Sequence, residues 1–194
     1  MSVKDYETRL YVKDDLSIGK SLVLKNDQSH YIRSVLRLKE NSQIALFNGE
    51  EGEWLSTIKI ISKKFVELEV IEQIKLQDVI SDIWLVFAPI KRTRIDYLAQ
   101  KATELGAGAL WPIFTKYTSV SRVNAERLRS NSIEAAEQSG RLTVPKILDP
   151  IDFDTLIEKW PHDRDLFCLD ETGRGAPILD AFRSSHPVSY THLR

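Results

Sequence analysis

The sequence has very little cysteine and no long apolar segment. Its single cysteine, Cys168, cannot form an intramolecular disulfide, which fits a protein of a reducing compartment. No stretch approaches the roughly 18 to 20 consecutive apolar residues of a transmembrane helix. Residues 1–7 lack the apolar centre of a signal peptide. From these absences we expect a cytoplasmic protein without a membrane partner.

A charge excess of one sign is also lacking. The 27 Lys and Arg residues nearly balance the 28 Asp and Glu residues, which gives a net charge of −1 and a pI of about 6.4. A strongly basic domain is the usual electrostatic signature of a nucleic-acid-binding protein, and this chain does not show it. Any RNA site must therefore be a local patch in which a few Lys and Arg side chains contact phosphates.

The histidines do not indicate a metal site. None of them stands at the spacing to another histidine or to a cysteine that zinc sites use. No Ser-His-Asp or Cys-His arrangement stands out in the sequence. We therefore predict neither a metal centre nor a nucleophilic triad.

Residues 1–72 are predicted to form a small β-barrel. Apolar runs at 9–12, 21–24, 43–47, 53–58 and 65–70 are bounded by polar turns, and the last run alternates with the period of a strand. A helix over 30–38 interrupts them, and we expect Asp27 as its N-cap. Several short strands with one helix are typical of a barrel.

The pattern changes after a polar segment, 73–82, which we interpret as a linker. A continuous apolar run at 83–88 predicts a strand buried on both faces. Helices are then expected at 93–105, 124–139 and 153–159, alternating with strands at 109–113, 144–148 and 165–169. Such alternation predicts a parallel sheet covered by helices. The fold class is thus α/β, with a barrel preceding an α/β domain at 83–187.

A basic turn follows the first strand of this second region. Residues 88–94 (APIKRTR) carry Lys91, Arg92 and Arg94 and are expected at the carboxyl edge of the sheet, where open α/β sheets bind ligands. These cations could contact an RNA phosphate together with the N-terminus of the next helix. A solvated basic loop is an equally good interpretation. The turn lacks the glycine pattern of a P-loop or a dinucleotide site.

Two helical segments combine charged side chains with alanine and glycine. In the first, Lys101 and Glu104 stand three residues apart and share one helix face. In the second, at 134–141 (EAAEQSGR), Glu137 and Gln138 follow two alanines that permit close packing. These residues either support a site or form a structural polar network that holds helix to sheet. Taken singly, the structural role is favoured.

The barrel region also has basic residues near aromatic ones. His30, Arg33 and Arg37 lie on or near one face of the predicted helix, and Arg9 precedes them on a strand. RNA recognition needs cations for phosphates and flat rings for unstacked bases. The alternative is a helix that exposes its polar face to solvent, which is the better interpretation of these residues alone.

Together these segments resemble the RsmE family of ribosomal RNA uracil-N3 methyltransferases. The similar segments follow one another in order: 9–12, 30–37, 47–49 (FNG), Lys91 with Arg94, 101–106 (KATELG), Pro112, 134–141, and Val144 with Pro145. Their joint order and spacing make the resemblance specific, although no single segment would suffice.

The resemblance implies a PUA-like RNA-binding barrel joined to a SPOUT-type methyltransferase domain, whose knotted α/β fold is an exception to the usual absence of knots. It further implies a homodimer with its active site near the subunit interface. The cofactor would be S-adenosyl-L-methionine, and the reaction methylation of uridine N3 in 16S ribosomal RNA of the small subunit. The alternative is a non-catalytic RNA-binding protein that uses the barrel and the basic turn.

The chemistry of this reaction sets requirements for the protein. The uracil must lose a proton, and its nitrogen must align with the sulfonium methyl group. A cationic side chain near the uracil carbonyl oxygens would stabilise the anionic base. Arg94 and Arg141 are the candidate catalytic residues by their chemical type.

Relatives in the RsmE family continue into glycine-rich cofactor loops of the forms IGPEGG and LGxxILR, which this sequence does not contain. The last residues, 188–194 (VSYTHLR), match nothing in the family. We therefore expect an incomplete methyltransferase domain without the knot, inactive alone, and we assign no cofactor-binding residue.

Overall fold

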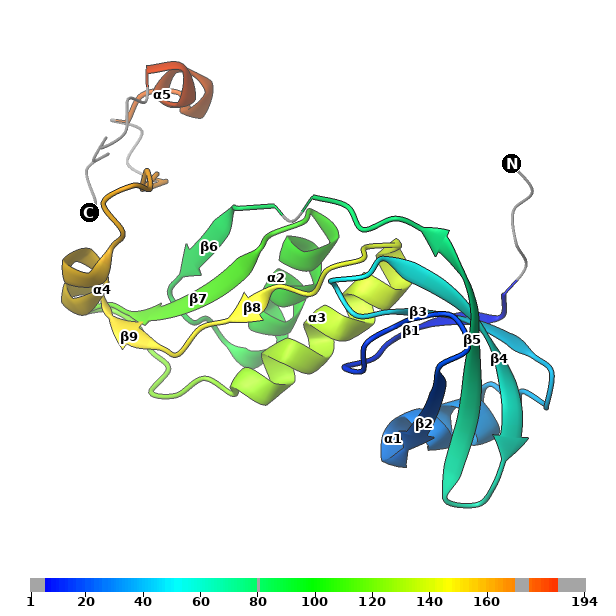
Figure 1. The fold of residues 1–194 in the computed structure, drawn as a ribbon. Helices are drawn as coiled ribbons and strands as arrows, with labels where there is room; N and C mark the ends of the chain where they lie inside the picture. The colour runs from blue at the N-terminus through cyan, green and yellow to red at the C-terminus, as the bar shows by residue number, and fades with distance from the viewer. Residues whose placement is uncertain (1–5, 80, 170–174, 185–194) are drawn as a thin grey trace. The chain divides into compact units, whose positions relative to one another are not determined.

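The computed structural model describes residues 6–79, 81–169 and 175–184, without the side chains of Arg92 and Ser184. The chain divides into two compact units, Met1–Pro150 and Ile151–Arg194. The first unit holds a five-stranded sheet followed by parallel strands and two long helices (Figure 1). The segment 188–194 lies outside the described residues.

The five-stranded sheet is built from the apolar runs of the barrel region. Its strands, in the spatial order β1-β3-β4-β5-β2, are β1 (Thr8–Tyr11), β2 (Ser21–Lys25), β3 (Gln43–Phe47), β4 (Glu53–Ile61) and β5 (Phe65–Lys75). Strands β1 and β3 are parallel, and the other neighbours are antiparallel. Alternation along β2 and β5 sends Leu22, Leu24, Val66 and Leu68 into a common apolar core.

The helix of the barrel begins earlier than we predicted and is partly a π-helix. Helix α1 (Asn26–His30) starts directly after β2 and continues into η1 (Tyr31–Val35), so the prediction of a helix over 30–38 with Asp27 as N-cap is wrong. Asn26 adopts φ 50°, a conformation that asparagine tolerates, and this lets the chain leave the strand at once. Ile32 anchors the helix to the barrel, because its side chain is fully buried in the barrel core.

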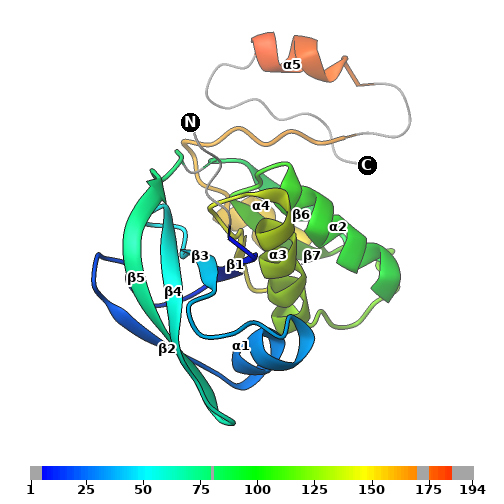
Figure 2. The same cartoon turned by 90° about the vertical axis from the view of Figure 1, so that its right-hand side faces the viewer.

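The second half of the first unit is a parallel sheet with helices. Strands β6 (Trp84–Phe87), β7 (Ala109–Phe114) and β8 (Lys146–Ile147) are parallel, with β7 in the middle. Helices α2 (Arg92–Glu104) and α3 (Ala125–Ser139) lie side by side in both views (Figures 1 and 2). The predicted α/β alternation is confirmed. Two boundaries differ: β5 runs to Lys75, so the linker cannot begin at 73, and β8 is shorter than 144–148.

The second unit contains β9 (Ile151–Asp152), α4 (Phe153–Lys159) and α5 (Ile178–Ser184). Helix α4 has the predicted bounds, and the Asp152 side chain caps it by accepting the Thr155 N–H at 2.8 Å. The predicted strand at 165–169 is wrong, because only Leu166 forms an isolated bridge there. An apolar run becomes a strand only where a neighbour completes its hydrogen bonds, and Leu169 is instead largely exposed.

Candidate functional site

The basic turn stands where two parallel strands end. Strand β6 pairs with β7 up to Phe87 and Pro112, so the loops after both strands leave from the same edge of the sheet. These loops line a cavity of about 520 Å³ that includes Lys91, Arg94 and Tyr117. Both cationic residues are exposed. The predicted place of the turn at the carboxyl edge is therefore what the structure shows.

The start of helix α2 adds to the positive character of this cavity. Lys91 precedes the helix and provides no side-chain cap, and the first turn contains no acidic residue. The first N–H groups of a helix carry partial positive charge and favour an anion. The backbone and the side chains at this edge thus favour the same kind of ligand. The side chain of Arg92 lies outside the described residues.

A second cavity, of about 870 Å³, adjoins the same loops and contains an ion pair that the sequence did not indicate. Asp96 of α2 accepts two hydrogen bonds from the Arg127 guanidinium, at 2.7 and 2.5 Å, and a third from Asn131 Nδ2 at 2.8 Å. The carboxylate raises the pKa of Arg127 through this hydrogen bonding. The contact joins α2 to α3 close to the start of each helix, beside the loops. Nothing in the spacing of these residues along the chain could have revealed it.

The two charged helical segments meet at their C-terminal ends. Helix α2 ends in a Schellman motif, in which Gly106 N–H bonds the Thr103 carbonyl and Ala107 N–H bonds the Ala102 carbonyl, both at 2.9 Å. Arg141 Nε donates to the Glu104 carbonyl at 2.9 Å. A Cβ at Gly106 would stand 2.9 Å from the Arg141 guanidinium, so the glycine makes room for it.

The two candidate catalytic arginines are not brought together within the chain. Arg94 lies in the first turn of α2, whereas Arg141 binds Glu104 at the last turn. Ten residues of α-helix separate these points, which corresponds to about 15 Å along the axis. Arg94 faces the cavity at the sheet edge, and Arg141 belongs to the joint between the helices.

Lys101, Glu104 and Glu137 of the helical segments bind other groups of the chain. Lys101 Nζ binds the two Glu104 carboxylate oxygens at 2.9 and 2.7 Å, and this hydrogen bonding raises the pKa of Lys101. Glu137 accepts the Tyr11 N–H at 2.9 Å, and its burial raises the pKa of its carboxyl group. Gln138 is exposed and lines a shallow cavity of about 360 Å³ between α2 and α3.

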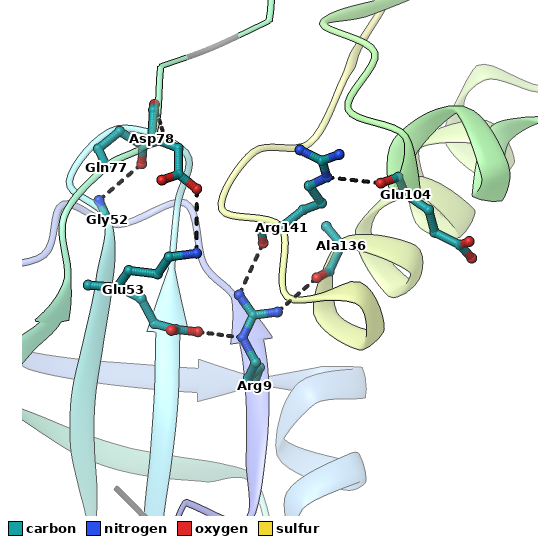
Figure 3. Close-up of polar contacts among 9 residues, drawn as sticks. Arg9, Gly52, Glu53, Gln77, Asp78, Glu104, Ala136 and Arg141 are labelled. Atoms are coloured by element: carbon teal, nitrogen blue, oxygen red, sulfur yellow. Dashed lines mark hydrogen bonds and ion pairs between the residues drawn. The ribbon is translucent and has the colours of Figure 1, made fainter. Parts of the chain in front are cut away.

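Arg9 joins the barrel to helix α3 (Figure 3). Its guanidinium is nearly buried and binds the buried Glu53 carboxylate. It also donates to the carbonyls of Ala136, Glu137 and Arg141, at 2.8, 3.0 and 3.1 Å. A cation is favourable there, because these carbonyls lie at or just beyond the negative end of the helix. The prediction that Arg9 contacts RNA is therefore corrected, since its donors are held by protein acceptors.

The other predicted RNA contacts of the barrel remain at its surface. His30 and Arg37 are exposed, and Arg37 adopts φ 55° just after the helix. Arg33 Nη1 donates to the Ser62 carbonyl at 3.2 Å and also to the Lys63 carbonyl. This contact ties the helix to the turn between β4 and β5.

The described residues hold no cluster of His, Cys, Asp and Glu side chains able to bind a metal ion. None of the helices described is long and apolar enough to cross a membrane.

Two family models match the chain. An RNA methyltransferase domain matches residues 77–189, and an RNA methyltransferase PUA domain matches residues 24–71. The first match alone covers more than half of the chain.

Curated relatives carry one common description, ribosomal RNA small subunit methyltransferase E. The protein from Rickettsia conorii is 36% identical over 152 residues, which are 78% of this chain and 62% of the relative. The protein from Synechocystis is 29% identical and covers 90% of this chain and 58% of the relative. The chain thus spans about three fifths of the length of these relatives.

Solved structures show the same fold. A methyltransferase E from Neisseria gonorrhoeae, bound to S-adenosyl methionine, superposes with a TM-score of 0.70 at 27% identity, covering 81% of this chain and 67% of that one. A methyltransferase from Legionella pneumophila in complex with the same cofactor gives a TM-score of 0.74 at 24% identity, over 82% of this chain and 69% of that one. A PUA-like barrel followed by a SPOUT-type domain is therefore the architecture of this protein. The chain belongs to the RNA methyltransferase family, and within it to the ribosomal RNA small subunit methyltransferase E (RsmE) family.

Proposed function

We propose that this protein takes part in the methylation of uridine N3 in 16S ribosomal RNA, with S-adenosyl-L-methionine as the methyl donor. The observation that carries the proposal is the joining of two modules in one chain. A PUA-like barrel is fixed to a methyltransferase sheet whose carboxyl edge bears a basic, cavity-forming turn. RNA held by the barrel and the turn would present a uridine at that edge.

The residues of the basic turn suit the binding of RNA and the stabilisation of an anionic base. Lys91 and Arg94 line the cavity after β6, beside a helix N-terminus without an acidic residue. We assign phosphate contacts to Lys91 and Arg92, and we assign to Arg94 the stabilisation of negative charge on the uracil oxygens. Arg141 is the second candidate, because no described residue binds its terminal guanidinium nitrogens.

The cofactor supplies an electrophilic methyl group when it is bound. The described residues contribute no glycine-rich loop at the carboxyl edge of β6, β7 and β8, so we assign the cofactor to none of them. The relatives solved with the cofactor support its use by this family. What this chain supplies is the frame: it binds RNA, orients the base and keeps the two modules in a fixed relation.

We further propose the predicted division into a barrel, a linker ending at 82 and a methyltransferase domain at 83–187, with the end of the barrel moved from 72 to the end of β5 at Lys75. The small ribosomal subunit is the proposed partner, in the cytoplasm, and the active form is a homodimer. The family models, which meet between residues 71 and 77, support this division.

The test measures transfer of tritiated methyl groups to purified small ribosomal subunits. The enzyme tested, called the joined enzyme, fuses this chain to the C-terminal part of the Rickettsia conorii relative that this chain does not match. We expect transfer to small-subunit RNA and little to large-subunit RNA. Arg94→Gln should lower the rate about 100-fold or more, the usual effect of losing a group that stabilises developing negative charge. Lys146→Gln, an exposed charge change on β8, is the matched control and should leave the rate unchanged.

The alternative is an RNA-binding protein without catalysis. It would show RNA binding that weakens with salt, together with no transfer in the joined enzyme. Equal transfer to both ribosomal subunits would instead count against the proposed substrate.

A further inference from the structure

One end of the barrel carries four cations from three separate segments. We name them the hairpin-end cluster: Lys25, Arg33, Lys63 and Lys64. Lys25 ends strand β2 opposite Phe65, which directly follows Lys64 in the β4–β5 turn. Arg33 of η1 reaches the same turn through the Ser62 and Lys63 carbonyls. Figure 2 shows α1 and the β4–β5 hairpin at the same end of the barrel.

The charges of this cluster are not neutralised within the described protein. No ion pair among the described residues joins any of the four cations to a carboxylate. Lys25, Lys63 and Lys64 are exposed. The acidic residues nearest in sequence or register are Asp27 and Glu67, and Glu67 accepts a hydrogen bond from Ser21 at 2.8 Å. Three lysines elsewhere in the barrel region are paired: Lys20 with Asp15, Lys59 with Glu69 and Lys75 with Asp78.

Arg33 gives the cluster a fixed geometry. Its Nη1 donates to two carbonyls of the turn, which ties the turn to the helix. That helix is itself fixed by Ile32, which is fully buried. Lys63 and Lys64 therefore belong to a turn that is hydrogen-bonded to the helix, and Arg33 is a positioning residue.

We propose that the hairpin-end cluster is a binding surface for the sugar-phosphate backbone of RNA, separate from the basic turn at the sheet edge. The inference rests on the proposed function, which supplies RNA as the partner. The cluster consists of cations, and Tyr31, the aromatic residue two positions before Arg33, packs against the barrel core. Such a surface positions RNA and reads no bases. The β4–β5 turn lies at the opposite end of β4 from Glu53, which binds Arg9.

The test compares two triple variants with the same change in net charge. K25Q/K63Q/K64Q removes the unpaired lysines, and K20Q/K59Q/K75Q removes the paired ones. Binding of the full chain to two 20-base-pair RNA duplexes of unrelated sequence is measured by fluorescence anisotropy from 50 to 300 mM KCl. Each phosphate contact adds roughly 0.7 to 0.9 to the slope of log K against log salt, so the cluster variant should lose about 2 and bind roughly 100-fold more weakly at 0.1 M.

The proposal is supported if the cluster variant loses affinity to the same extent for both duplexes, and if the affinity of the control variant falls less than about threefold. Equal weakening by the two triple variants would show a general charge effect and overturn the proposal. A salt slope in the cluster variant equal to that of the wild-type chain would also overturn the proposal. In that case the proposed function would still stand, provided that the wild-type chain bound RNA. If the wild-type chain bound neither these duplexes nor small-subunit RNA, the proposed function would itself fail. Thermal melting of each variant checks that these surface changes leave the fold unaltered.

Discussion

Arg9→Met should destabilise the joint between barrel and methyltransferase half more than any exposed charge change. Arg9 and Glu53 form an ion pair in which both side chains are less than a tenth exposed. Removing one partner of a buried pair costs about 3–5 kcal/mol, because the other charge stays buried without compensation. The carbonyls of Ala136, Glu137 and Arg141 lose their donor at the same time.

The expected loss corresponds to a fall in Tm of roughly 6–20 °C for a chain of this size. Urea unfolding followed by circular dichroism gives the free energy directly. Lys101→Met is the matched control, since the Lys101–Glu104 pair is partly exposed and solvent-exposed ion pairs contribute little to stability.

A double-mutant cycle separates the pair from the rest of the contact. In R9M/E53M neither charge remains, so its destabilisation should fall short of the sum of the single changes by about 2 kcal/mol or more. Additive effects, or a loss below about 1 kcal/mol in Arg9→Met, would refute the reasoning that this pair carries the joint.

Three further changes test local features of the frame. Burial raises the pKa of Glu137, so stability should fall as pH rises from about 4.3 through that raised pKa. Glu137→Gln keeps an oxygen for the Tyr11 N–H and should be more stable than wild type at pH 7 but not at pH 4, as measured by melting across pH. Gly106→Ala should lower the free energy of unfolding by about 1–2 kcal/mol, since Gly106 has φ 87°. Most of this loss should persist in an Arg141→Ala background, which removes the close contact between the new Cβ and the Arg141 guanidinium. Asn124→Ala, at the cap of α3, should cost about 1 kcal/mol in urea unfolding; no loss would show that the cap is replaced by water.

Periodicity and turn chemistry predicted most of the strands and helices, because both depend on residues that are close together in the sequence. The alternation in β5, the apolar run of β6 and the end of α2 at Gly106 all appear in the structure. Strand ends were less predictable. The polar residues from 73 onwards look like a linker, yet β5 continues because β4 supplies hydrogen-bonding partners as far as Lys75.

The candidate site was only partly predictable, for a physical reason. The place of the basic turn follows from strand direction, which the sequence pattern indicates. The partner of a charged side chain does not follow, because it depends on contacts between distant segments. Arg9 looks like an RNA contact in the sequence but binds α3 and Glu53. Asp96 and Arg127, which join α2 to α3, are 31 positions apart.

The central claim, methylation of uridine N3 in 16S ribosomal RNA, is tested most directly by identifying the product. Small subunits are treated with the joined enzyme and isotopically labelled S-adenosyl-L-methionine. The nucleosides of their RNA are then separated by chromatography and identified by mass spectrometry. The account predicts labelled N3-methyluridine in 16S RNA, strongly reduced by Arg94→Gln and unchanged by Lys146→Gln. Label in a different base, or on ribose, would contradict it.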